Sequence, residues 1–444
     1  MQRDVQIDHN ESQRPRKSLG LGSRAGHSRF LEKKQSDAAR ADGESGAEKT
    51  SASTSDASIP RIVGMPSLTG MRAFAAAVVF TCHSIAQFYI APGETSRSLA
   101  MFLLPIGQAA VSFFFLLSGF VLMSNPRKND TLLAFWRRRA FRVYPNHLVT
   151  WCVGLALLVI SGQQVSASIA APSLLLVHDW YPATDLSAVL SQGVNPISWS
   201  LSCEVFLYLC FPLLAWVVGR LSRRGLWLTA GVLVAVVFCV PFVSGVIPGA
   251  PLPGVNYNLL QFYFVYAAPP VRMLEFMLGM VLARMVHEKM WPGIRLWAAT
   301  AFCVAGYAAA GMVTERSGKP LLFTMVAMTI VPMAVMVATA AATDLSLRPS
   351  FLRNRVLVWL GQISFAFYLV HYLILQHGFT KVTSKLQPGL PGAIGIAVVF
   401  FGICVLAAWL LYTFVERPIS QWRWGGDPRG GGDKATSLVA EVRS

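Results

Sequence analysis

The stretch MRAFAAAVVFTCHS, residues 71–84, sets out the physical problem that this chain poses. It is nearly all Ala, Val and Phe, as in a membrane-spanning helix, yet Arg72 stands near its start and His83 lies eleven residues further on. Eleven residues at 100° each amount to about three full turns, so both side chains project from the same side of a helix. Gln87 lies one turn beyond His83 and extends this polar stripe.

The depth of His83 favours a functional role. At a rise of 1.5 Å per residue, His83 lies about 16 Å above Arg72, near the middle of a bilayer. An ionisable group at that depth is costly and normally faces a cavity or a partner. A neutral His that bonds a neighbouring helix as a packing contact is the alternative, and the stripe of three polar residues weighs against it.

The composition indicates that the whole chain is a membrane protein. Of its 444 residues, 54% are hydrophobic and 14% are charged, whereas a soluble domain carries about a quarter charged residues. Apolar runs recur at close to the roughly 20 residues that a spanning helix needs. We therefore predict an all-α polytopic membrane protein of the cell (inner) membrane, with about ten transmembrane helices. The runs lie at about 71–91, 102–124, 143–161, 197–218, 226–247, 259–284, 294–312, 320–342, 356–377 and 392–415.

The distribution of charge predicts the orientation. Lys and Arg concentrate in the joints after the even-numbered runs, and both termini are basic, so both termini are expected in the cytoplasm. The net charge of +16 then matches a cytoplasmic fringe beside anionic lipid. It calls for no nucleic-acid partner, which would require a basic soluble domain. No Cys pair shows CxxC spacing, so no metal site is expected.

Three segments follow from this pattern. Residues 1–60 are polar and poor in large apolar side chains, which predicts a disordered cytoplasmic tail. Residues 61–420 form the membrane domain, and residues 421–444 form a flexible cytoplasmic C-terminal tail. The longest outer joint, 162–196, contains HDWYPATD and could form a small lid or an amphipathic segment on the surface.

Two further ionisable residues are predicted at depths similar to that of His83. Glu204, in SWSLSCEVFLYLCFP, lies about 10 Å below the outer edge, and His371, in ISFAFYLVHYLIL, about 22 Å above the cytoplasmic end of its run. Together they suggest one water-accessible chamber open towards the outer half. Glu204 could orient His83 or be a structural partner of Arg272, and both alternatives stay open.

A third cluster is basic and lies at a cytoplasmic helix end. In FWRRRAFRVYPNH, Arg139 and Arg142 are three residues apart and share a helix face. Basic clusters occur at such ends for topological reasons alone. However, paired guanidinium groups also bind phosphates, and coenzyme A is a cytoplasmic ligand that such a site would suit.

Small residues follow in VSFFFLLSGFVLM, where Ser118 and Gly119 lie in the cytoplasmic third of the second run. Small residues within a span usually allow close helix packing. A narrow passage for an acyl-pantetheine arm would also need them.

These stretches together, in the order in which they follow one another along the chain, resemble the acyltransferase 3 family of integral-membrane acyltransferases. That family has an Arg and a His separated by ten residues on its first span, as Arg72 and His83 are. FFFLLSGF, RRRAFRVYP, SWSLSCEVFLYLCFPLL and ISFAFYLVHYLIL are similar to its later motifs, and ERP at 416–418 to its usual ending. The resemblance covers residues 66–420. Within the family, the chain looks most like the members that acylate sugars on macrolides and other secondary metabolites.

The resemblance implies transfer of an acyl group, often acetyl, from acyl-CoA as co-substrate to a hydroxyl of a carbohydrate or macrolide-type acceptor. No permanently bound cofactor is implied. His83 would act as general base, positioned by Glu204 and His371. The donor would be held at the cytoplasmic side by Arg72, Arg139, Arg142, Ser118 and Gly119.

Other functions were weighed against this one. A proton-coupled secondary transporter of a small polar metabolite would also use mid-membrane His and Glu. Such carriers show broken helices in corresponding positions of two repeated halves, a pairing that this sequence does not show. A non-catalytic membrane sensor would not need the stripe on the first run. Direct transfer and a covalent acyl-enzyme both remain open, with Ser118 and Cys82 as candidate carriers.

Overall fold

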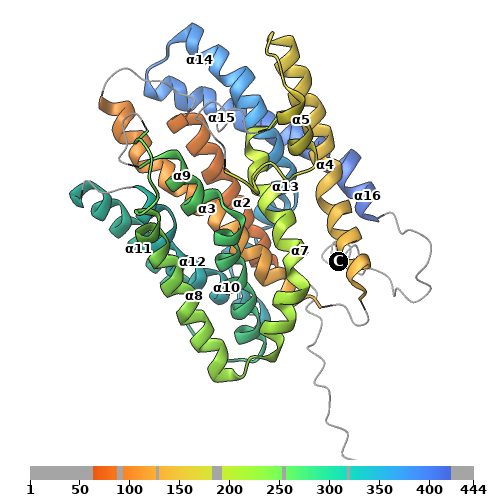
Figure 1. The fold of residues 1–444 in the computed structure, drawn as a ribbon, viewed down its shortest axis with the longest axis vertical. Coiled ribbons are helices and arrows are strands. Elements are labelled where there is room, and N and C mark those ends of the chain that lie inside the picture. Colours follow the sequence, from red (N-terminus) through yellow and green to blue (C-terminus); the bar gives the residue numbers. More distant parts are fainter. Residues whose placement is uncertain are drawn as a thin grey trace, which may run out of the picture. The chain divides into compact units, whose positions relative to one another are not determined.

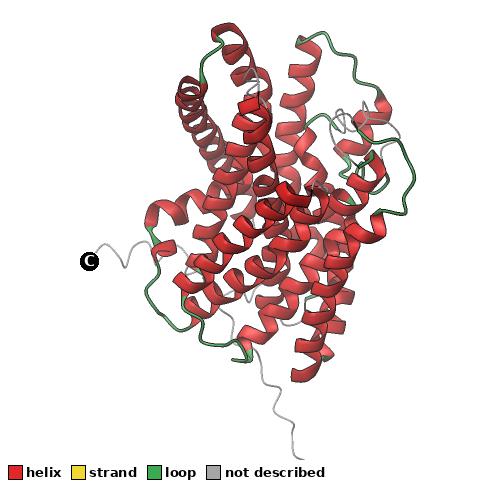
Figure 2. Ribbon diagram, turned by 90° about the vertical axis from the view of Figure 1, so that its left-hand side faces the viewer, coloured by secondary structure: helices red, strands yellow, loops and turns green. Residues whose placement is uncertain are grey.

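The computed structural model describes residues 64–87, 94–126, 130–182, 193–252, 257–317 and 321–421. All of them belong to one compact unit, Ile59–Ser444. The predicted tails fall outside these residues, apart from position 421, and remain predictions. Within the described residues the chain forms helices and loops and no strand (Figures 1 and 2).

The main helices follow the apolar runs. Several of them continue into short π-helical turns, at Cys82–Gln87, Tyr263–Ala267, Leu375–Phe379 and Tyr412–Glu416. The α-helices are α2 (Pro66–Thr81), α3 (Glu94–Ser124), α4 (Leu132–Ile160), α5 (Ala167–Leu174), α7 (Trp199–Arg220), α8 (Arg223–Ser244), α9 (Leu259–Phe262), α10 (Pro269–His287), α11 (Leu296–Ser317), α12 (Leu321–Leu345), α13 (Arg355–Ile374), α14 (Thr380–Leu386), α15 (Leu390–Leu411) and α16 (Arg417–Gln421).

The prediction of an all-α polytopic membrane protein is confirmed. In the described part of the chain, 8 helices are long and apolar enough to cross a membrane, and a pair bent by 67°, Arg355–Gln362 with Ser364–Leu386, would make a ninth. The shorter apolar helix Leu296–Ala310 covers the remaining predicted run. The boundaries differ by several residues in places, most of all in the third span, which begins at Leu132 rather than near 143. The arginine motif therefore lies on the spanning helix itself.

Glycines bring two pairs of helices into backbone contact. A Cβ added to Gly361 on α13 would lie 1.9 Å from the carbonyl oxygen of Thr69 on α2. At the crossing of α3 with α10, a Cβ on Gly119 would lie 1.9 Å from the Phe276 carbonyl oxygen, and one on Gly279 would meet α3 at the same distance. Small residues allow this close approach in membranes, so these crossings fix α2 against α13 and α3 against α10.

The start of α2 is held by a distant part of the chain. Asp344, at the end of α12, accepts hydrogen bonds from the Ser67 backbone N–H at 2.8 Å and from the Ser67 hydroxyl at 2.7 Å. Arg353 pairs with the same carboxylate at 2.9 Å. The first N–H groups of a helix have no partner within it. A buried carboxylate from another helix therefore satisfies one of them here.

The loop after α5 folds into the helix bundle. Asp179 is fully buried, its backbone carbonyl accepts a hydrogen bond from Tyr263 at 3.0 Å, and its carboxyl group accepts one from Cys203. Burial raises the pKa of Asp179 well above its ordinary value, which favours the neutral carboxyl group. Trp180 donates to the Ser202 carbonyl at 3.0 Å. Residues 176–179 of the outer joint are thus anchored in the bundle, whereas residues 162–168 are mostly exposed.

We expect acid to release this loop through His178. Burial, reinforced by the charge of His147, lowers the His178 pKa from 6.5 to about 4. A lowered folded-state pKa means that the released loop binds the proton more readily. The contribution of His178 to the stability of the docked state should therefore fall by about 3 kcal/mol as the pH falls from 6.5 to about 4, while the raised pKa of Asp179 acts in the opposite direction. The measurement is hydrogen-exchange protection of residues 176–181, corrected for the intrinsic pH dependence of exchange, in the wild-type protein and in a His178→Asn variant. The wild type should lose more protection than the variant over this interval, and identical pH dependences in the two proteins would contradict the assignment.

A second prediction concerns the contact between α2 and α13. Gly361→Ala should force these backbones apart and destabilise the protein by about 1–3 kcal/mol, seen as a lower melting temperature in detergent. Gly402→Ala is the matched control, because nothing lies within 4 Å of the added Cβ on α15. Equal melting temperatures for the two variants would show that the crossing tolerates a methyl group.

Candidate active site

Two imidazoles that are 288 residues apart in the sequence come into contact inside the helix bundle. His83 lies in the π-helical turn that follows α2, and His371 lies near the end of α13. His83 Nδ1 is 2.9 Å from His371 Nε2, and the two rings stack with centroids 5.1 Å apart. The structure therefore brings together two of the residues whose depths in the sequence agreed.

The hydrogen bonds determine which ring nitrogens carry protons. His371 Nδ1 lies 2.7 Å from the Tyr368 carbonyl oxygen and 3.2 Å from that of Phe367. Carbonyl oxygens only accept hydrogen bonds, so His371 Nδ1 must be the protonated nitrogen. His371 Nε2 then accepts from His83 Nδ1–H. In the neutral pair, this leaves His83 Nε2 with a free lone pair, which is the form a general base needs.

The two imidazoles differ in accessibility. His371 is fully buried, with its ring stacked on Phe367 at 5.7 Å and packed near Phe80. His83 is only half-buried, and the edge of Tyr372 meets its ring at 5.2 Å. His83 is therefore the member of the pair that a reactant can reach, and His371 is held behind it.

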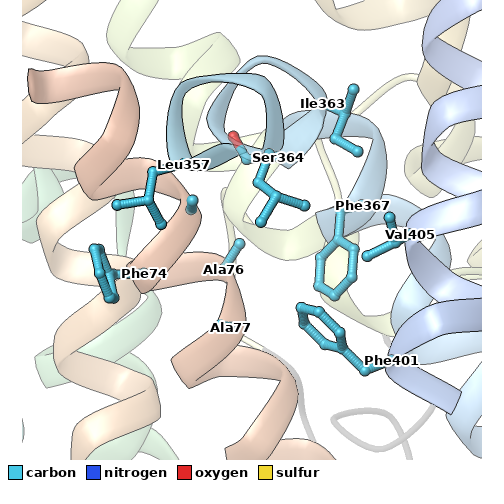
Figure 3. A pocket seen from close by; sticks show the side chains of 11 residues that line it. Phe74, Ala76, Ala77, Leu357, Ile363, Ser364, Phe367, Phe401 and Val405 are labelled. Atoms are coloured by element: carbon cyan, nitrogen blue, oxygen red, sulfur yellow. The ribbon is translucent and has the colours of Figure 1, made fainter. Parts of the chain in front are cut away.

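An aromatic layer separates His371 from an apolar pocket of about 130 Å³ between α2, α13 and α15 (Figure 3). Phe367 and Phe401 lie next to each other on one wall of this pocket, with centroids 5.3 Å apart. The Ser364 hydroxyl, which also lines it, donates to the Gly361 carbonyl at 2.8 Å. The pocket thus suits an apolar group, and Phe367 stands between it and the imidazole.

Glu204 lies elsewhere than either prediction for it required. Its carboxylate accepts hydrogen bonds from Ser118 at 3.2 Å and from Tyr208. Arg272, the alternative partner, instead pairs with Glu275 at 3.0 Å, and both of these side chains are fully buried. The structure does not bring Glu204 to His83 or to Arg272.

The position of Glu204 follows from where α7 begins. Asn195 and Ser198, just before this helix, are completely buried, and Asn195 donates to the Leu369 carbonyl at 2.9 Å. The helix therefore starts inside the bundle, close to the level of His371, not at the outer membrane surface. Glu204 lies nine residues further on, about 13 Å closer to the other end of the helix. The depth counted from a surface boundary was accordingly too shallow.

Glu204 instead joins the predicted arginines. Arg72 interacts electrostatically with Arg142, with Glu204 and with Glu416. Arg142 Nη1 is 2.8 Å from Glu416 Oε1. The guanidinium of Arg139 lies 5.9 Å from the centre of the Tyr208 ring. The second polar centre thus combines the three predicted guanidinium groups with two carboxylates.

Three members of this centre were missed from the sequence. Tyr208 binds Glu204, and Asn146 donates to Glu416 Oε2 at 2.7 Å. A weak signal was available for two of them, because Tyr208 follows Glu204 by four residues and Asn146 follows Arg142 by four, so each pair shares a helix face. Glu416 could be noticed only as part of ERP.

The small residues on α3 divide between the two interpretations weighed for them. Ser118 points to Glu204, so it belongs to the second polar centre. Gly119 packs directly against the Phe276 carbonyl and leaves no passage on that side of the helix. The close-packing interpretation therefore describes Gly119.

The two centres share one helix. Arg72 within α2 and His83 in the π-helical turn that continues it are separated by about 16 Å along the helix axis. One centre holds several cations, and the other holds a base with its lone pair exposed. This arrangement suits an extended ligand with an anionic end and a reactive end.

Comparison with known proteins bears on this arrangement. A family model described as an acyltransferase domain matches residues 65–413. A similar protein is "Acyltransferase MdmB" of Streptomyces mycarofaciens, 38% identical over 369 residues that cover 81% of this chain and 92% of that protein.

Two more distant relatives also match. "O-acetyltransferase OatA" of Staphylococcus aureus is 23% identical over 387 residues, which cover 80% of this chain and 57% of that protein. "Nodulation protein 10" of Rhizobium leguminosarum bv. viciae is 26% identical over 329 residues, which cover 69% of this chain and 82% of that protein.

Proposed function

Because the chain belongs to the acyltransferase 3 family, we propose that it is an acyl-CoA-dependent O-acyltransferase acting on a hydroxyl of a carbohydrate or glycosylated small molecule. The acyl group is acetyl in the simplest case. The observation that carries this proposal is the His83–His371 pair, whose hydrogen bonds leave a basic nitrogen on the accessible ring. The names of two relatives, an acyltransferase and an O-acetyltransferase, support the reaction type.

The imidazole pair supplies the chemistry of this reaction. His83 Nε2 accepts the proton of the acceptor hydroxyl while the hydroxyl oxygen attacks the thioester carbonyl carbon. The carbon–sulfur bond then breaks, and the leaving thiolate takes up the proton from His83, so the base is regenerated. His371 orients His83 and stabilises its charged form, as the third member of a catalytic triad does.

Direct transfer is favoured by the surroundings of the two candidate carriers. The Ser118 hydroxyl donates to Glu204, in the other polar centre. The thiol of Cys82 packs against Gly107 on α3, although its neighbour in sequence is the base. Neither side chain is aligned with an imidazole nitrogen as a nucleophile requires.

The second centre would bind the donor. Guanidinium groups form charge-assisted, often bidentate hydrogen bonds to phosphates, so Arg72, Arg139 and Arg142 suit the phosphates of coenzyme A. The pantetheine arm would then extend along α2 towards His83. The charge distribution predicts that both termini lie in the cytoplasm. In this orientation the second polar centre would lie towards the compartment that holds acyl-CoA.

We expect the catalytic base to be separable from donor binding. His83→Ala should lower kcat for release of free coenzyme A by at least about 10²-fold, because the hydroxyl loses its proton acceptor. Its dissociation constant for acetyl-CoA should stay near the wild-type value. Purified protein in detergent with labelled acetyl-CoA and a sugar acceptor gives both quantities.

The same assay tests the pair as a unit. His371→Gln should also lower kcat strongly, and the double variant should be little worse than either single variant, since residues acting as a unit are not additive. His377→Ala, another imidazole further along the same span, should remain active. Full activity of His83→Ala would remove the imidazole pair from the mechanism.

The donor site makes a different prediction. Arg142→Ala should raise the dissociation constant for acetyl-CoA by about 10-fold or more, because a charge-assisted hydrogen bond is lost. Arg137→Ala is the control, since Arg137 belongs to the same basic motif but is exposed. Equal acetyl-CoA affinities in these two variants would mean that Arg142 does not bind the donor and serves only to orient the protein in the membrane.

A further inference from the structure

Glu416 is a buried carboxylate at the end of a membrane-spanning helix. It ends the π-helical turn Tyr412–Glu416 that follows α15, and it is only 3% exposed. Acidic side chains are almost never fully buried unless they are paired. The turn is packed against α4, so the partners of Glu416 come from the helix that carries the arginine motif.

One of those partners forms an ion pair with the carboxylate, and the other donates a hydrogen bond to it. Oε1 is 2.8 Å from Arg142 Nη1, and Oε2 accepts a hydrogen bond from Asn146 Nδ2 at 2.7 Å. Arg142 and Asn146 are one helical turn apart, and Asn146 is buried. Asn146 therefore fixes the carboxylate, and the carboxylate in turn holds the guanidinium.

The pairing leaves much of Arg142 available. A guanidinium has five N–H donors in a planar fork, and Glu416 contacts one of its terminal nitrogens. The Arg142 side chain is 38% exposed, so its remaining donors can reach an incoming ligand. Glu416 itself, being buried, cannot.

Charge adds a second effect. Arg72 is repelled by Arg142 and attracted by Glu416. This repulsion favours separation of the two guanidinium groups, and the more exposed one would then turn towards solvent. Glu416 opposes the separation because it ion-pairs with Arg142 and attracts Arg72.

We propose that Glu416 is a positioning residue for the donor: it holds Arg142 beside Arg72 so that both guanidinium groups bind the phosphates of one acyl-CoA molecule. This inference rests on the proposed function, because it assumes that the arginine centre binds the donor. Glu416 does not touch the ligand. It acts through the orientation of Arg142.

A competing role makes the opposite prediction. If Glu416 merely competed with phosphate for Arg142, removing its charge would tighten donor binding. If it positions Arg142, removing the charge weakens donor binding even though the site becomes more positive. The sign of the effect therefore decides between the two.

The experiment measures acetyl-CoA dissociation constants and steady-state kinetics for the purified full-length protein in detergent. Glu416→Gln keeps the size and an oxygen for Asn146 but removes the charge. Glu416→Asp keeps the charge with a shorter reach. Glu288→Gln is the matched control, since Glu288 also ion-pairs with an arginine, Arg284, on α10. Melting temperatures establish that each variant is folded.

We expect Glu416→Gln to raise the dissociation constant and KM for acetyl-CoA by about 10-fold. Glu416→Asp should lie between it and wild type, with kcat and the acceptor KM nearly unchanged in both variants. Glu288→Gln should bind as wild type does. If Glu416→Gln does not fold, the Asp variant decides, with a several-fold loss of donor affinity expected.

Unchanged or tighter donor binding in a folded Glu416 variant would overturn the inference. So would an equal rise of donor and acceptor KM, which a general structural defect produces. The proposed function fails in a different way, namely if the wild-type protein neither binds acetyl-CoA nor releases coenzyme A. The two failures are therefore distinguishable.

Discussion

The hydrogen bond between His83 and His371 is the constraint on which the site depends. It forms only because α2 and α13 approach to backbone contact at Gly361 and Thr69. A larger residue at this crossing would separate the helices and with them the two rings. Helix packing and proton chemistry are in this way parts of the same arrangement, since the position of a backbone sets the tautomer of a base.

The division of the site into two centres explains why one continuous helical segment, Pro66–Gln87, carries both a guanidinium group and an imidazole. Arg72 and His83 belong to one rigid rod, so the distance between them cannot adjust to the ligand. If the guanidinium group and the imidazole lay on two helices that moved relative to each other, the distance between them would vary. The buried carboxylate of Asp344, which holds the Ser67 end of α2, prevents the rod from sliding along its axis.

Helical periodicity and membrane depth were sufficient to predict much of this site. They placed His83 and His371 at matching levels, and the spacing of Arg139 and Arg142 put both on one face of their helix. These inferences succeeded because each depends on geometry within one helix. The predicted depth of Glu204 was wrong for a physical reason. The loop before α7 enters the bundle and displaces the start of the helix inward. Partners such as Glu416 and Asn146 lie 270 residues apart, and such a contact has no period in the sequence.

The hydrogen bonds between Ser67, near the start of α2, and Asp344 also bear on the order in which the protein assembles. Ser67 lies near the beginning of the chain, and Asp344, which holds it, is 277 residues further on. His371 is synthesised later still. The residues that satisfy the start of α2 and that pair with His83 are therefore synthesised only after most of the other transmembrane segments. The His83–His371 pair accordingly cannot form until α13 has been made.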